Sequence, residues 1–417
     1  MVHDIAVEKS TNKSKTAVLK LLLFFLWPFG SFLYALLYRP NSKSSYCVYF
    51  LWGLLFCWSI YYSPWDSFYI DFVTIVEKFY DTQLTFSELC DRIIGILTLS
   101  SYTDGADFYN IVVYWLSHQF SSNFHFMYVI AGIPFLYCML YSLRFITQDQ
   151  YFKANVYGYI LLFLFVLPCS IFAIQNFRFS TGFWCCVFLI LKVFYEQKKK
   201  YIPLFIVLPF IHYSFWLVIV VFLVFSFLKG HNKLIKWILI CSIPFAVIPI
   251  NAILDSFTNS NLLPIFLAEK GDAYLSDEAT ANWGMYANGM RSYFKVIQSI
   301  IAVVATYIML MYIEKQEVDK RLCSLLKLLC ILLFTVNFIN VVPVIGERFY
   351  LLCRTLCIFL WFKICPQKKY FIWIFLAGAA LDIYEISMLY MKVLTPDFFY
   401  SNLFWLVVKN IGITHYY

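Results

Sequence analysis

The sequence predicts an all-α polytopic integral membrane protein, and its composition and its apolar pattern both lead to this class. Of its 417 residues, 62% are hydrophobic and only 13% are charged. The mean hydropathy of +0.73 describes more apolar surface than a soluble domain can bury. The apolar residues form continuous runs, unlike the alternating pattern of membrane strands. Because lipid offers the backbone no hydrogen-bond partners, each crossing is expected to be a helix of about 20 residues.

The apolar runs predict roughly 11–13 transmembrane or re-entrant helices. They lie near residues 17–38, 46–62, 124–146, 155–174, 179–195, 202–211, 213–228, 234–254, 294–313, 322–343, 349–363, 370–390 and 399–413. No internal repeat, low-complexity tract or linker separates them. Residues 1–417 are therefore expected to form a single transmembrane domain.

The first run has two readings. Lys15 precedes it, and Arg39 and Lys43 follow it, whereas membrane topology keeps basic residues on one side. The run either crosses with the amino terminus outside or turns back at Pro28 and Gly30. The stretch before it is too polar, and the run itself too long, for a cleaved signal peptide, so we expect the run to be retained.

Basic and acidic residues are separated along the chain. The positive-inside rule places six basic clusters in the cytoplasm: Arg39/Lys43, Arg144/Lys153, Lys198–Lys200, Lys229/Lys233/Lys236, Lys315/Lys320/Arg321 and Lys363/Lys368/Lys369. Between residues 63 and 123, eight acidic residues stand against two basic ones, and between 255 and 292 five stand against two. We assign both stretches as long extracytoplasmic loops. Amphipathic stretches in the first loop are typical of helices that lie along the membrane interface.

This topology requires the run from 202 to 228 to enter the membrane and come back. A single crossing would place the clusters at Lys198 and Lys229 on opposite sides. Pro209 interrupts helical hydrogen bonding, and His212 follows it closely. Two short or tilted segments are therefore expected to meet near His212, as broken helices do where they line a protein cavity.

Three polar residues then fall at the outer ends of apolar segments: Gln175, Arg178 and His212. An arginine at the centre of a membrane helix costs roughly 2.5 to 3.5 kcal/mol on insertion scales. A chain that carries such groups is expected to use them. These residues are therefore the first candidates for a functional site, on the outer face.

Other polar residues in the apolar runs have structural explanations. Asn337 and Asn340 share a helix face and are expected to bind a neighbouring helix. Asp382 and Glu385 lie near the outer end of a late helix, where we expect hydration at the interface. Most of the 13 cysteines lie inside apolar runs and read as small core residues. No cysteine or histidine spacing fits zinc, so we predict no metal and no cofactor.

Four short motifs occur along the chain in the order of a known family. They are Tyr102-Thr-Asp104-Gly-Ala-Asp107-Phe-Tyr109, Gln175-x-x-Arg178, His212-x-Ser214 and Glu347-Arg348-Phe349. In their order and loop positions, from about residue 17 to 365, they resemble the EpsG/Wzy-type bacterial polysaccharide polymerases. One departure concerns the first motif, because the family often has glycine directly before the aspartate and this chain has Thr103.

The resemblance implies a GT-C-like membrane fold and a lipid-linked polysaccharide polymerase of the bacterial inner membrane. Such an enzyme makes O-antigen, capsule or exopolysaccharide by transferring a growing glycan from undecaprenyl diphosphate to the next lipid-linked unit, at the outer face. The implied partners are this lipid-linked oligosaccharide, membrane lipid and a chain-length regulator protein, with no nucleic acid. The leaving diphosphate needs cations, which arginine supplies bidentately without a metal, and the acceptor hydroxyl needs a general base.

The candidate site residues follow from these needs. Arg178, Arg291 and Arg348 are assigned to the diphosphate, His212 as base or orienting group, and Gln175 and Ser214 as hydrogen-bonding partners. Asp104 and Asp107 are acceptor-sugar contacts or an alternative base, and Glu347 contacts substrate or holds Arg348 or Arg354.

Each assignment has a structural alternative. Arg178 and Arg348 can snorkel to headgroups, and Arg291 can pair with a carboxylate in its own acidic loop. His212 can be a satisfied histidine at a helix break, and Asp107 can cap the helix that follows it.

Three other functions compete with polymerisation. An O-antigen ligase shares the carrier and the Arg/His chemistry and differs in its acceptor. A flippase or other transporter is expected to have short loops and ionisable residues near the midplane. A membrane acyltransferase requires His212 to face a cytoplasmic acyl donor, which the outer placement of His212 disfavours.

Overall fold

The computed structural model describes residues 15–61, 70–98, 108–245, 290–339, 343–388 and 393–411. Within these ranges every regular element is a helix, and the single β-bridge, between Ile60 and Leu394, is isolated. The predicted all-helical class is confirmed for the described residues. Asp104, Asp107 and most of the predicted second loop, 255–292, lie outside them.

The helices follow the apolar runs, with interruptions. The first half contains a helix at 15–26, then α2 Pro28–Leu37, α3 Lys43–Trp58, α4 Ile70–Asp81, α5 Phe86–Leu97, α6 Tyr109–His118, α7 Phe124–Thr147, α8 Val156–Val166, η2 Leu167–Cys169, η3 Ile171–Asn176, α9 Phe177–Ile190 and the π-helical turn η4 Leu191–Tyr195. The second half contains η5 Lys199–Val207, α10 Leu208–Ile211, η6 Tyr213–Phe215, α11 Trp216–Leu228, α12 Asn232–Phe245, α16 Met290–Lys315, α17 Lys320–Ile339, α18 Pro343–Ile364, α19 Phe371–Gly378, α20 Ala380–Met388, η8 Pro396–Phe399 and α21 Leu403–Ile411.

Four helical stretches among the described residues are long and apolar enough to cross a membrane: Phe124–Thr147, Val156–Tyr195, Val296–Lys315 and Lys320–Ile339. They confirm a membrane protein, while the larger number of crossings stays a prediction. The predicted run at 399–413 contains α21, which is described over Leu403–Ile411. The chain breaks after η8, and α21 has nine residues, which span only about 14 Å.

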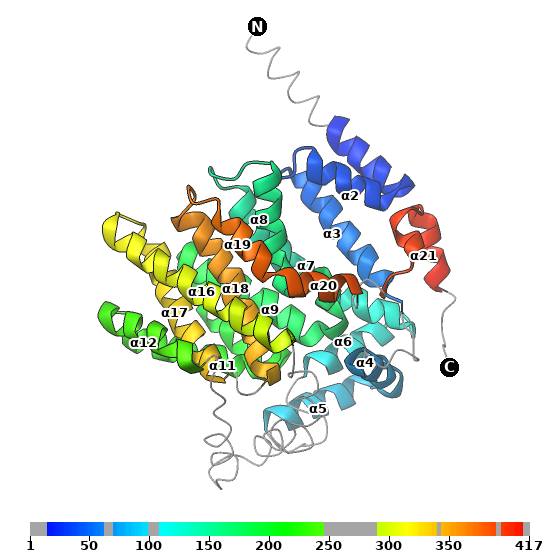
Figure 1. Ribbon diagram of the computed structural model, residues 1–417. Helices are drawn as coiled ribbons and strands as arrows, with labels where there is room; N and C mark the ends of the chain where they lie inside the picture. The colour runs from blue at the N-terminus through cyan, green and yellow to red at the C-terminus, as the bar shows by residue number, and fades with distance from the viewer. Residues whose placement is uncertain are drawn as a thin grey trace.

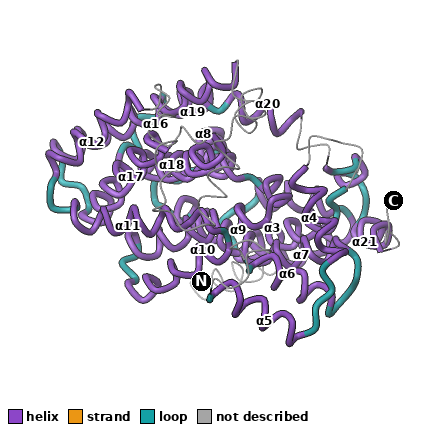
Figure 2. The backbone as a smooth tube through the Cα atoms, turned by 90° about the horizontal axis from the view of Figure 1, so that it is seen from below, coloured by secondary structure: helices purple, strands orange, loops and turns teal. Residues whose placement is uncertain are grey.

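Two groups of helices pack side by side. One contains α3, α7 and α9, and the other contains α12, α16 and α17, with α18 packed against α16, α17, α8 and α9. Figure 2 shows α12, α16 and α17 on one side of the molecule and α3, α7 and α21 on the other. Small residues permit the closest approach, because a Cβ on Gly132 of α7 would lie 2.7 Å from the Cys57 Sγ of α3.

The first apolar run turns back on itself. The side chain of Lys20 is fully buried and donates from Nζ to the backbone oxygen of Tyr38 and to Ser45 Oγ, at 2.8 and 2.6 Å. A straight continuation of the helix would separate Lys20 from Tyr38 by about 27 Å. The chain therefore reverses at Trp27 and Pro28. Of the two readings of this run, the structure supports the turn, which brings Lys20 to the end of the molecule that holds Arg39 and Lys43.

The break predicted near His212 is confirmed. Pro209 lies in the first turn of α10, where proline is tolerated, and the helix ends at Ile211. His212 then has extended backbone angles, φ −153° and ψ 120°. The rings of Phe205 and Phe222, on either side of the break, meet at 4.4 Å between centroids, so the chain folds back after His212.

The predicted cytoplasmic clusters gather at one end of the bundle. The ring of Tyr195 contacts Arg321 of α17 at 5.7 Å and Lys363 of α18 at 4.9 Å. Lys363 also pairs with Asp149, directly after α7. Lys327 of α17 donates to the backbone oxygen of Lys229, 2.9 Å away.

The Asn337 side chain binds neighbouring helices, as predicted, and it reaches two of them. It accepts a 2.8 Å hydrogen bond from Ser299 of α16 and donates a 3.0 Å bond to Ser242 of α12. Asn340 lies outside the described residues.

Candidate functional site

Three segments that are far apart in the sequence meet around the ring of Phe179. Phe179 stands at the start of α9, and its ring lies 5.7 Å from His212 at the helix break, edge to face. The guanidinium carbon of Arg348, from α18, lies 5.3 Å above the same ring. We call this group the Phe179 cluster, and it comprises Phe179, His212, Ser214, Phe215, Arg348 and Phe349.

Aromatic packing fixes the three segments relative to one another. Phe215 stacks on Phe179 at 5.8 Å, and its edge meets Phe349 at 5.5 Å. Gly182, one turn after Phe179, leaves no room for a side chain, because a Cβ would lie 2.5 Å from the Phe215 ring. The break, α9 and α18 are therefore held at fixed spacing where the polar side chains meet.

His212 and Ser214 form a local pair. The Ser214 hydroxyl lies 2.8 Å from His212 Nδ1, and the Ser214 backbone N–H donates to the same nitrogen at 3.3 Å. Both side chains are buried. Because Nδ1 accepts from a backbone N–H, the neutral ring carries its proton on Nε2.

Arg348 and Phe349 lie near the start of α18 and bring this helix into contact with the Phe179 cluster. Arg348 and Glu347 are both half-buried.

Arg354, which the sequence offered as a partner for Glu347, forms its ion pair with Asp382 of α20 at 2.7 Å. The expectation that Asp382 is hydrated at the interface is wrong, because its carboxylate pairs with Arg354 and only 18% of its side chain is exposed.

Gln175 lies shortly before α9 and is engaged with its own helical turn. It lies in η3 and is buried, and its side-chain amide donates to the Phe172 backbone oxygen at 3.2 Å. Its own backbone oxygen accepts a long 3.5 Å hydrogen bond from the Tyr128 hydroxyl of α7. In this state the amide is engaged inside its own helical turn, which matches a structural role.

Arg178 stands between the Phe179 cluster and α6. It lies in the first turn of α9, between Phe177 and Phe179. The ring of Phe177 meets the edge of Tyr114 from α6 at 6.4 Å. Burial raises the pKa of Tyr114, and the Arg178 guanidinium acts in the opposite direction, which places Arg178 near α6.

Helix α6 also reaches the break. The Phe108 ring, immediately before α6, stacks on Phe210 of α10 at 5.2 Å. Figure 1 shows α4, α5 and α6 grouped at the lower end of the molecule. Of the first motif, Asp104 and Asp107 lie outside the described residues. The side chain of Arg291, near the start of α16, is also outside them.

Sequence reasoning missed a second polar group, on another face of α18. Arg354 and Asp382 are joined there by Gln298 of α16, which donates to Asp382 Oδ2 at 3.2 Å and to the Gly378 backbone oxygen at 2.7 Å. The sequence evidence for this group was an arginine in the middle of the apolar run 349–363. Its partners lie on other helices, and residue spacing along the chain does not predict them.

The cysteines are free thiols, and most are buried, as predicted; Cys47 and Cys241 are exposed. Among the described residues, no three His, Cys, Asp or Glu side chains are grouped so as to hold a metal ion.

Fold and site define the class of this protein, an all-helical integral membrane protein with a buried His–Ser pair and an arginine converging on one aromatic ring. Comparison of the chain with protein-family models, curated proteins and solved structures finds no match.

Proposed function

We propose that the protein is a glycosyltransferase that polymerises undecaprenyl-diphosphate-linked oligosaccharide units at the outer face of the bacterial inner membrane. The observation that carries this proposal is the convergence on Phe179 of Arg348 and of His212, whose ring is held by Ser214. The order of motifs that resembles the EpsG/Wzy-type polymerases includes all of these polar residues.

The position of the cluster along the helices supports an outer site. Phe179 and Tyr195 are separated by about 22 Å along α9 and η4, and Arg348 and Lys363 by a similar distance along α18. Tyr195 and Lys363 belong to the end where the basic residues gather. If this end faces the cytoplasm, as the positive-inside rule requires, the Phe179 cluster faces outward.

The proposed transfer requires a balanced exchange at the anomeric carbon. The bond from this carbon to the diphosphate oxygen breaks, with its electron pair leaving on the diphosphate. A bond to the acceptor hydroxyl oxygen forms, and the hydroxyl proton moves to a base. Arg348 and Arg178 are proposed to stabilise the charge on the diphosphate.

The geometry favours His212 as an orienting group. With Nδ1 held by Ser214, Nε2–H is a donor that can hold a substrate oxygen. If His212 orients the substrate, a carboxylate must act as the general base. The first motif provides Asp104 or Asp107 for this purpose. Arg291 and Glu347 remain proposed substrate contacts, Gln175 is proposed to stabilise the segment before α9, and no metal or other cofactor is proposed.

A second candidate function, a flippase or other transporter, is favoured by one observation. Arg354 and Asp382 form an ion pair inside the helix bundle, next to the point where α19 and α20 separate at Ala379. Ionisable residues beside a broken helix are typical of transport paths. A ligase also shares the chemistry of the Phe179 cluster.

Deleting the gene and examining the surface glycan on a gel distinguishes a polymerase, a ligase and a flippase. Loss of a polymerase leaves the lipid core with a single repeat unit. Loss of a ligase leaves bare core with polymer on the carrier, and loss of a flippase leaves bare core without polymer.

Complementation then tests the site. Arg348→Ala and Arg178→Ala are each expected to reduce polymer at least 100-fold, because an arginine that holds a leaving diphosphate contributes several kcal/mol to the transition state. Arg321→Ala, at the basic end, is the matched control and is expected to restore full-length polymer. If both site variants restore polymer at normal protein level, the assignment of these arginines is wrong.

A further inference from the structure

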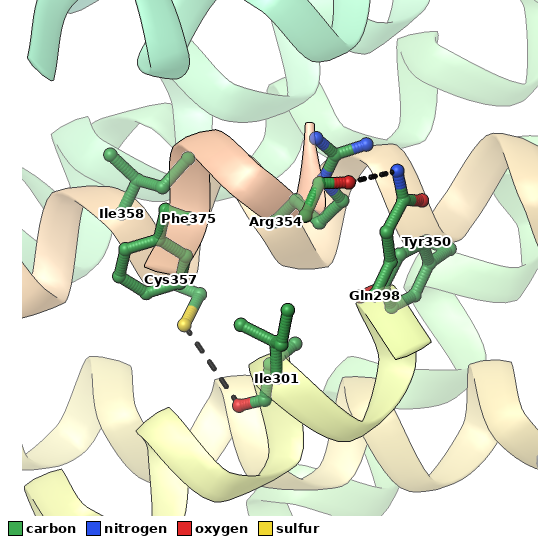
Figure 3. Close-up of a pocket in the computed structure, with 9 residues that line it drawn as sticks. Gln298, Ile301, Tyr350, Arg354, Cys357, Ile358 and Phe375 are labelled. Carbon is green, nitrogen blue, oxygen red and sulfur yellow. Dashed lines mark hydrogen bonds between the residues drawn. The ribbon is translucent and has the colours of Figure 1, made fainter. Parts of the chain in front are cut away.

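A cavity lies between α16, α18 and α19, on a different face of α18 from the Phe179 cluster. It is lined by Gln298, Ile301, Tyr350, Arg354, Cys357 and Phe375, among others. Figure 3 shows Arg354 and Gln298 reaching into this region from α18 and α16. Counted out to its open mouth, the cavity encloses about 310 Å³, and its inner part has room for about one water-sized group.

Two hydrogen-bonding groups in the wall of this cavity are unsatisfied. The Nη1 atom of Arg354 and the hydroxyl oxygen of Tyr350 are buried and have no hydrogen-bond partner among the described residues. Each residue is only 8% exposed. A buried unpaired donor is costly, and most buried polar groups in folded proteins have a partner. Both groups line the same cavity, so one oxygen atom in its inner part can accept from both.

The charge of the site limits what this oxygen belongs to. Asp382 accepts from Arg354 Nη2 at 2.7 Å and from Gln298 at 3.2 Å. The aspartate therefore neutralises one side of the guanidinium, and the site is rich in donors without a net positive charge. Such a site suits one singly charged phosphodiester better than a diphosphate, whose additional charge the carboxylate repels.

The depth and the surroundings of the cavity suit a lipid. Gln298 lies about 3 Å along the helix axis from Val296, where the apolar stretch Val296–Lys315 begins. The cavity is therefore near one end of the membrane-spanning stretch, away from Lys315. Exposed apolar side chains flank it on α16 (Ile297, Ile300 and Val304) and on α19 (Trp373 and Ile374).

We propose that this cavity binds the phosphodiester group of a membrane phospholipid, with one phosphate oxygen accepting hydrogen bonds from Arg354 Nη1 and Tyr350. The remainder of the headgroup fills the wider mouth, and the acyl chains lie along α16 and α19. The site is separate from the glycosyl transfer proposed above and does not depend on it.

The test measures lipid binding by the purified full-length protein in detergent micelles. Phosphatidylglycerol, diacylglycerol and undecaprenyl diphosphate are titrated separately, with the unfolding temperature as the readout. Phosphatidylglycerol is expected to raise the unfolding temperature, and diacylglycerol, which lacks the phosphate, is not. If diacylglycerol gives the same rise, no phosphate is recognised. If undecaprenyl diphosphate binds more tightly than phosphatidylglycerol, the phosphodiester assignment is wrong.

Two variants address the residues. Tyr350→Phe removes the unsatisfied hydroxyl, so the lipid-free unfolding temperature is expected to stay the same or rise, while the Kd for phosphatidylglycerol weakens roughly tenfold. Tyr384→Phe, at an exposed tyrosine of α20, is the matched control. The double variant Arg354→Gln/Asp382→Asn removes both charges without leaving one unpaired, and is expected to abolish the lipid-dependent rise. If Tyr350→Phe binds phosphatidylglycerol as the wild type does, the cavity holds only water.

Discussion

The imidazole of His212 is oriented by its neighbour two residues later. Both the hydroxyl and the backbone N–H of Ser214 approach Nδ1, so the orientation and tautomer of the ring are set within a three-residue turn. This arrangement depends on the break at His212, since an uninterrupted helix would point residues 212 and 214 in different directions. The same break that reverses the chain thus fixes the orientation of the ring.

A prediction follows for Ser214. Ser214→Ala is expected to lower the rate of polymerisation in membranes roughly 5- to 10-fold, by removing one hydrogen bond to the ring. Ser226→Ala is the control, because Ser226 is exposed on α11 and bonds to the Phe222 backbone oxygen in its own helix. Rates are compared per folded protein, measured by size-exclusion chromatography. A loss of folded protein with an unchanged rate would mean that Ser214 is only structural.

At the scale of helices, the sequence predicted where the chain breaks more accurately than it predicted which polar side chains become buried. The reversal at His212 and the loop helices are visible in prolines, charges and amphipathic patterns. The burial of Asp382 was not, because its carboxylate is stabilised by Arg354 and Gln298 from two other helices. From sequence alone, a carboxylate near a helix end is predicted to be hydrated, because the helices that could supply its partners are not yet known.

Helix α5 carries a pH-dependent cap. Glu88 and Thr85 form a capping box, and hydrogen bonds from the Thr85 backbone N–H and hydroxyl lower the pKa of Glu88 below its usual value. A carboxylate with a lowered pKa stabilises the folded helix above the unfolded pKa, near 4.3, and this contribution is lost as pH falls through the lower folded value.

Hydrogen exchange measures this effect. After correction for intrinsic exchange, amides in the first turn of α5 are expected to lose protection as the pH is lowered below about 4. In Glu88→Gln this pH dependence is expected to disappear. The first turn of α8, which is capped by Asn155 and contains no carboxylate or histidine, provides the internal control. Equal pH dependence in both helices would contradict the role of Glu88.

For the molecule as a whole, the sidedness of the charges is the organising feature. Basic residues from α17 and α18 gather around Tyr195 of η4, and the Phe179 cluster lies at the other end of α9 and α18. Helices that cross a bilayer must keep their charged ends on fixed sides. Charge counts along the sequence therefore predicted which ends lie together, before any contact was known.

Labelling of single cysteines tests this arrangement. With the exposed thiols Cys47 and Cys241 and the partly exposed thiols Cys90, Cys185 and Cys323 replaced by alanine, Gln197→Cys and His231→Cys are both expected to react with a membrane-impermeant maleimide only from the cytoplasmic side. Ser121→Cys, at the end of α6, is expected to react from the outside. Reaction of Gln197→Cys and His231→Cys from opposite sides would mean that residues 202–228 cross once.

The class of the protein, its helical content, the sidedness of its charges and the break near His212 were determined by the sequence alone, because hydrophobicity, charge and proline act locally along the chain. The tertiary structure alone decided which side chains meet. It turned the first run back at Trp27, brought Arg348 to Phe179, bonded the Gln175 amide to Phe172 in its own turn, and paired Arg354 with Asp382. These contacts depend on how helices cross and how far each is rotated about its axis, which close packing of all the side chains determines together.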